Sequence, residues 1–69
     1  MEQSIRNELP GTIKSIVSDK VLSEVIMKTS IGEIASVITT RSVQEMKLKV
    51  GDKVFALVKA TNVSLRRQL

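Results

Sequence analysis

Apolar and polar residues alternate along several short segments of the chain, and this period of two is typical of β-strands that are half buried. In residues 21–28, for example, Val25 and Met27 share one face while Glu24 falls on the other. Valine and isoleucine are abundant, and both residue types favour strands. Turn-forming residues such as Pro10-Gly11 separate the segments. The pattern predicts five strands, at residues 12–17, 21–28, 33–39, 53–59 and 63–66.

The period changes after residue 39, where a short helix is expected. Ser42-Val43-Gln44-Glu45 has the form of a capping box, in which the serine and glutamate side chains bond to free backbone N–H groups at the helix start. Gly51 is expected to stop the helix after about two turns. The element order is therefore βββαββ. This order fits one all-β domain over residues 1–69, an OB-like Greek-key barrel of five strands with one short helix between strands 3 and 4.

Both faces of the fourth predicted strand are apolar. Val54 and Ala56 lie on one face, while Phe55 and Leu57 lie on the other. A small barrel needs only one buried face, so the second face either meets another subunit or belongs to a buried central strand. A chain of 69 residues buries little surface by itself, and this one has no cysteine for disulfides. We therefore expect a homo-oligomer.

The composition excludes several classes of function. The chain has no histidine and no cysteine, so the usual zinc ligands, the commonest general base and common nucleophiles are missing. Its seven carboxylates are scattered, and no pair resembles an acid–base couple. We expect no enzyme, no directly coordinated metal cation and no cofactor. No apolar run is long enough to span a membrane and the N-terminus lacks the apolar region of a signal peptide, which predicts a cytoplasmic protein.

The net charge of +4 and the pI near 9.9 favour an anionic partner. Nucleic acid is the first candidate, because basic β-domains often bind it. Proteins that bind single strands rely on aromatic side chains to stack the bases, however, and Phe55 is the only aromatic residue. Nucleic acid is therefore not the expected partner, and a nucleic-acid-binding OB-type domain is kept as the alternative.

Hydrogen-bond donors gather in three clusters that contain no carboxylate. They lie before the first predicted strand, between the third strand and the helix, and at the end of the fourth strand. The clusters are Ser4, Arg6 and Asn7, then Thr39, Thr40 and Ser42, then Lys59, Ala60 and Thr61. Such donors together suit a small tetrahedral oxyanion. Each cluster also has an ordinary explanation, as a solvated terminus, a helix cap or an exposed strand lysine.

Three segments of the chain resemble the Mop, or molbindin, family. Residues 4–13, SIRNELPGTI, are similar to the family's S-A-R-N-x-L-x-G-x-V opening. Residues 37–43, VITTRSV, are similar to its A-I-T-x-x-S segment, and residues 51–61, GDKVFALVKAT, to its G-D-K-V-x-A-L-V-K-A-T segment. The motifs keep the family's order and spacing and cover nearly the whole chain. Ile5 replaces the usual alanine, and Val50 stands where proline is frequent.

The resemblance implies an OB-type barrel that binds molybdate, and tungstate, as the intact oxyanion for storage and homeostasis. It also implies a homohexamer, a trimer of dimers, with anion sites between subunits. The site residues that it implies are Ser4, Arg6, Asn7, Thr39, Ser42, Lys59, Ala60 and Thr61. Arg6 and Lys59 would offset the charge of the dianion, and the other donors would set its orientation. A structural or regulatory interaction module without anion binding is a further alternative.

Overall fold

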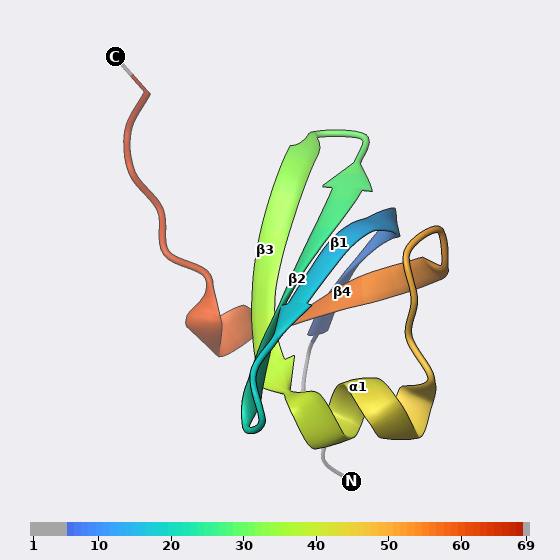
Figure 1. The fold of residues 1–69 in the computed structure, drawn as a ribbon. Helices are drawn as coiled ribbons and strands as arrows, with labels where there is room; N and C mark the ends of the chain where they lie inside the picture. Colours follow the sequence, from blue (N-terminus) through green and yellow to red (C-terminus); the bar gives the residue numbers. More distant parts are fainter. Residues whose placement is uncertain (1–5, 69) are drawn as a thin grey trace, which may run out of the picture.

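The computed structural model describes residues 6–68, which form one twisted antiparallel sheet with a short helix at its end (Figure 1). The elements are β1 (Arg6–Ser18), β2 (Leu22–Thr29), β3 (Gly32–Thr39), α1 (Thr40–Met46), β4 (Lys53–Lys59) and the 3₁₀ turn η1 (Ala60–Asn62). The strand order in the sheet is β3-β2-β1-β4. The all-β class and the short helix between the third and fourth strands are confirmed. Within residues 6–68, no helix is long and apolar enough to cross a membrane.

β1 is the longest strand and is shared between two neighbours. Residues 6–12 pair with β4 and residues 11–18 pair with β2, so both neighbours flank β1 only at Gly11 and Thr12. Pro10 lies just before this overlap, where β4 is the one described neighbour of β1. A proline is tolerated there because it lacks the backbone N–H that a second neighbour would require. Figure 1 shows β1 changing direction along its length while β4 runs across the sheet.

Two features accompany the bend of β1. The register with β2 shifts between Ile13 and Ser15, which leaves Lys14 as the extra residue of a β-bulge and increases the local twist. At Gly11, a Cβ atom would lie 2.5 Å from Met27 Cε and 2.6 Å from the carbonyl oxygen of Lys28. The chain therefore approaches β2 at Gly11 more closely than any other residue type would allow.

The core is small and lies between the sheet and α1. Ile13, Val25 and Val43 are buried and pack together, so Val43 is the buried residue of the helix. Two backbone hydrogen bonds of 2.9 Å join the turn before β4 to β1, from the Ile13 N–H to the Asp52 carbonyl oxygen and from the Gly51 N–H to the Ile13 carbonyl oxygen. The helix and the entry to β4 are thereby both fixed against the bulged part of β1.

The helix boundaries differ from the predicted ones. Thr39, and not Ser42, is the N-cap of α1: its backbone is extended (φ −70°, ψ 146°) and its hydroxyl accepts a hydrogen bond from the Ser42 N–H. The predicted cap is wrong because β3 leads into the helix without a loop, so Thr39 is the last extended residue. The helix ends at Met46 and is capped by Lys47, whose backbone is left-handed (φ 55°), whereas Gly51 belongs to the turn before β4.

The predicted fifth strand and the closed barrel are not formed by the described chain. Residues 63–68 carry no regular secondary structure and lead away from the sheet (Figure 1). The sheet therefore has four strands and two open edges, β3 and β4. Large apolar side chains stay exposed as a result, with 63% of Phe55 and 93% of Leu65 accessible to solvent.

Candidate functional site

The first and third donor clusters meet at one end of the β1–β4 pair. Arg6 and Lys59 are direct antiparallel partners, and Asn7 is the partner of Val58. The prediction that Arg6 and Asn7 precede the first strand is therefore wrong, because pairing with β4 extends β1 back to Arg6. The Asn7 amide donates to the Val58 carbonyl oxygen at 3.3 Å, which orients this side chain. Ser4 lies outside the described residues.

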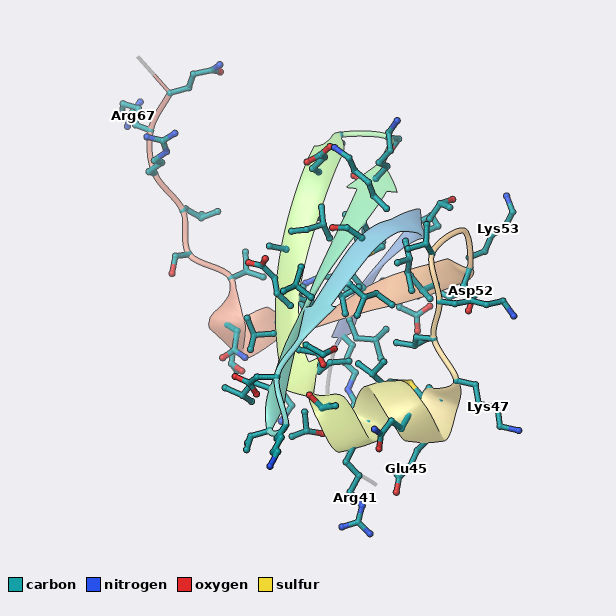
Figure 2. All side chains as sticks on the ribbon, viewed as in Figure 1. Arg41, Glu45, Lys47, Asp52, Lys53 and Arg67 are labelled. Carbon is teal, nitrogen blue, oxygen red and sulfur yellow. The ribbon has the colours of Figure 1, made fainter. Side chains whose placement is uncertain are left out.

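Arg6 and Lys59, called here the Arg6–Lys59 group, place two exposed positive charges beside each other. Side chains of directly opposite residues project from the same face of an antiparallel pair, and like charges in this position repel each other. The ion pairs of the described chain are Lys14–Glu33 and Arg41–Glu45. Figure 2 shows Arg41 and Glu45 on the side of α1 that faces away from the sheet. The Arg6–Lys59 group thus has no carboxylate partner among residues 6–68.

Ala60 and Thr61 begin η1 directly after Lys59, and both are exposed. The first N–H groups of a helical turn have no carbonyl partner within the turn. The Lys59 side chain makes no capping hydrogen bond to η1. Backbone donors and a lysine ammonium group therefore lie next to each other at the end of β4.

The second donor cluster lies at the junction of β3 and α1. Thr39 Oγ1 accepts from the Ser42 N–H at 3.0 Å and donates to Ser42 Oγ at 2.8 Å. The two side chains carry two hydroxyl hydrogens and use one of them in this contact. The hydroxyl hydrogen of Ser42 is left for a ligand, while the Ser42 backbone N–H is already bonded. Thr39 and Ser42 are called the Thr39–Ser42 group below.

The structure does not join the Thr39–Ser42 group to the Arg6–Lys59 group within one chain. Thr39 ends β3, which is one edge of the sheet, whereas Lys59 ends β4, which is the other edge. No side-chain hydrogen bond or ion pair in the described chain links the two groups. The chain also has a surface cavity of about 320 Å³. Its lining includes Lys28 and Lys53 but no residue of either group. One chain therefore offers two partial sites.

The hydroxyl group of Ser23, which contacts the second donor cluster through Thr40, is missing from the clusters that the sequence indicates. Ser23 is buried, and its Oγ lies 2.8 Å from Oγ1 of Thr40, the first residue of α1. The sequence did contain a signal for Ser23, because it is the one polar residue on the otherwise apolar face of residues 21–27. A buried hydroxyl requires a hydrogen-bond partner, so such a residue marks a contact worth seeking.

Known proteins resemble this chain over almost its whole length. The TOBE domain matches residues 3–65. Molybdenum-pterin-binding protein 2 of Clostridium pasteurianum is 35% identical over 66 residues, which cover 94% of this chain and 97% of that protein. Molybdenum transport protein ModE of Azotobacter vinelandii is 38% identical over 66 residues, but the matched part spans only 24% of its length.

Two solved structures share the fold. A molybdate-binding protein from Sporomusa ovata has a TM-score of 0.89 and 40% identity, and the match covers 97% of this chain and 100% of that one. MopII from Clostridium pasteurianum, in an apo form, has a TM-score of 0.85 and 33% identity, with coverage of 96% and 100%. The chain therefore belongs to the TOBE-domain family, and its resemblance to the Mop, or molbindin, proteins is confirmed.

Proposed function

We propose that this protein binds molybdate, and also tungstate, as the intact oxyanion and stores it in the cytoplasm. The observation that carries the proposal is the cross-strand pair of Arg6 and Lys59, which has no carboxylate partner among residues 6–68. Relatives of the chain are named for binding molybdate or molybdenum-pterin, which supports the choice of anion. The relatives are named for binding or transport of molybdenum compounds, which supports reversible capture without catalysis.

The chemistry of the two groups matches that of the proposed ligand. Molybdate is a dianion whose oxygen atoms accept hydrogen bonds, so its site must supply positive charge and donors. Arg6 and Lys59 supply both, and charge-assisted hydrogen bonds are the stronger kind. The Asn7 amide uses one N–H hydrogen on Val58 and keeps the other for the anion. The proposed ligand-binding residues are Ser4, Arg6, Asn7, Thr39, Ser42, Lys59, Ala60 and Thr61.

The complete site is proposed to form between subunits of a homohexamer, a trimer of dimers. The two partial sites lie on the two edge strands of the sheet and share no side-chain hydrogen bond or ion pair within the described chain, which supports a site completed by a second chain. Exposed apolar side chains support association. Phe55 and Leu57 project from the same face of β4 and are 63% and 55% accessible. Burying a side chain of this size contributes roughly 1.5–3 kcal/mol.

The five-stranded barrel is proposed to close within the same assembly. Val63 is extended (φ −95°, ψ 122°), and both Val63 and Leu65 are exposed. The outer edges of β3 and β4 offer unpaired backbone groups, and such edges readily accept a further strand. Pairing of residues 63–66 with an edge would supply the missing fifth strand and cover both apolar side chains.

Isothermal titration of the purified protein with molybdate tests the proposal, with tungstate, sulfate and a single-stranded oligonucleotide titrated in parallel. We expect binding heat from molybdate and tungstate and little from the oligonucleotide. Binding of the oligonucleotide alone, weakening steeply with salt, would instead support a nucleic-acid-binding OB-type domain. An intact oligomer that binds none of these anions would favour an interaction module and contradict the proposal.

A further inference from the structure

Ser23 is buried in the core, with 1% of its surface accessible, and its hydroxyl has two partners. Ser18 Oγ lies 2.6 Å away and Thr40 Oγ1 lies 2.8 Å away. Thr40 Oγ1 in turn donates to the Asp19 carbonyl oxygen at 2.8 Å. The three hydroxyl groups form a continuous chain that begins at the end of β1, passes through β2 and reaches the first residue of α1.

The carbonyl oxygen at the end of this hydroxyl chain sets the direction of each hydrogen bond. A carbonyl oxygen can only accept, so Thr40 uses its single hydroxyl hydrogen on Asp19. Thr40 must then accept from Ser23, and Ser23 must accept from Ser18. Removing the middle hydroxyl leaves Ser18 without its acceptor and Thr40 without the donor that Ser23 supplies, while Thr40 keeps its bond to Asp19.

The hydroxyl chain connects the start of α1 to the turn between β1 and β2. Hydrogen bonds hold this turn, because the Asp19 carboxylate accepts from the Val21 N–H at 2.7 Å and from the Leu22 N–H at 2.8 Å. The Thr40 N–H donates to the Val21 carbonyl oxygen at 2.9 Å. Thr40 is thus held through its backbone and its side chain at once, and it is the residue that directly follows Thr39.

We propose that Ser23 is a positioning residue for the oxyanion site, although it lies too deep to touch a ligand. Its hydroxyl holds Thr40, and Thr40 fixes the backbone from which Thr39 and Ser42 project. This inference rests on the proposed function, because it concerns the affinity of that site. Donors that are already in place bind more tightly than donors that must be ordered at the moment of binding.

Conservative variants separate positioning from packing. Ser23→Ala removes the hydroxyl without adding bulk, and Ser36→Ala is its matched control on the neighbouring strand β3. Ser36 is half buried and makes no side-chain hydrogen bond within the described chain. At position 40, valine keeps the shape of threonine without the hydroxyl, whereas serine keeps the hydroxyl.

Molybdate titration of these variants gives the first readout. We expect Ser23→Ala and Thr40→Val to raise the Kd for molybdate about fivefold, the factor that corresponds to one ordinary hydrogen bond. Ser36→Ala and Thr40→Ser should bind like the unaltered protein. If the unaltered protein binds molybdate and Ser23→Ala binds it equally well, the inference is overturned.

Amide hydrogen exchange of the anion-free protein gives a second readout that needs no ligand. In Ser23→Ala we expect the Thr40 and Ser42 amides to exchange about fivefold faster, with the Met27 amide unchanged. Unchanged exchange at Thr40 and Ser42 would also overturn the inference. If exchange responds but the unaltered protein binds no molybdate, the role of Ser23 in holding this junction stands and the proposed function fails.

Discussion

Arg6 and Lys59 come from opposite ends of the sequence and stand directly opposite each other in the sheet. Without an anion this arrangement is unfavourable, because like charges across a strand pair repel each other. In the proposed site, an anion between them would make both cations partners in charge-assisted hydrogen bonds. We therefore expect anion binding to relieve a repulsion and to form strong contacts in the same step.

Replacing either cation should weaken molybdate binding strongly. Hydrogen bonds to charged groups contribute roughly 1.5–3 kcal/mol, so Arg6→Ala and Lys59→Ala should each raise the Kd about tenfold or more. Titration calorimetry measures the change. Lys53→Ala is the control, because Lys53 is an exposed cation at the start of β4, whereas Lys59 ends that strand (Figure 2). An equal loss in the control would mean that net charge sets the affinity, and not the cation pair.

Gly11→Ala should destabilise the fold. The added Cβ would lie 2.6 Å from the Lys28 carbonyl oxygen, a backbone atom that cannot move without disturbing the β1–β2 ladder. Overpacking of this kind typically costs about 1–3 kcal/mol. Urea unfolding at one fixed protein concentration measures the free energy of unfolding. A Gly11→Ala protein as stable as the unaltered one would show that β1 and β2 can separate at this point without cost.

Asp19 should make stability depend on pH in the acid range. The N–H groups of Leu22 and Val21 donate to its carboxylate and hold the pKa of Asp19 below its ordinary value of 3.8. A lowered folded-state pKa means that the contribution is fully present above pH 3.8 and is lost as the pH falls through the folded-state pKa.

Thermal unfolding of the unaltered protein and of Asp19→Ala checks this expectation. Their Tm values should differ at about pH 6, and the difference should shrink as the pH falls below 3.8 and the folded-state carboxylate takes up its proton. The pKa of Glu33 is also lowered, by its hydrogen bond and charge interaction with Lys14, but Glu33 is present in both proteins. A Tm difference that stays constant over this range would contradict the assignment.

Phe55→Glu should dissociate the proposed oligomer. Phe55 is largely exposed in the single chain, and burying a new carboxylate in a subunit interface carries a large desolvation cost. Sedimentation velocity should show a smaller species than that of the unaltered protein. Gln44→Glu adds the same charge on an exposed position of α1 and should leave the assembly intact. An unchanged sedimentation coefficient for Phe55→Glu would place the interface elsewhere.

The strands that bury one face could be predicted from the sequence, and the start of β1 could not. β2 and β3 follow their alternating pattern to within a residue. The first residues of β1 are polar, and Pro10 interrupts them, so nothing local marks a strand there. Pairing with β4 makes these residues a strand, and this pairing comes from the tertiary fold. The tertiary context of a strand overrides the strand propensity of its residues in such a case.

The candidate site could be predicted as residue types but not as an arrangement. The three donor clusters were visible in the sequence, but the contact between Arg6 and Lys59 depends on the strand register, which residue types alone do not fix. Both Thr39 and Ser42 carry a hydroxyl group suited to an N-cap. Thr39 is the cap because β3 leads directly into α1. Residues 63–66 pair with no strand of the described chain, so their pattern of apolar residues was not enough to predict a strand.

Beyond the overlap at Gly11 and Thr12, residues 6–10 and 55–59 form a ribbon of only two strands. Two-stranded ribbons are marginally stable in water, so this one can fray while the core around Ile13 stays folded. In the proposed site, we therefore expect an anion held by Arg6 and Lys59 to escape through opening of this short ladder, and not through global unfolding.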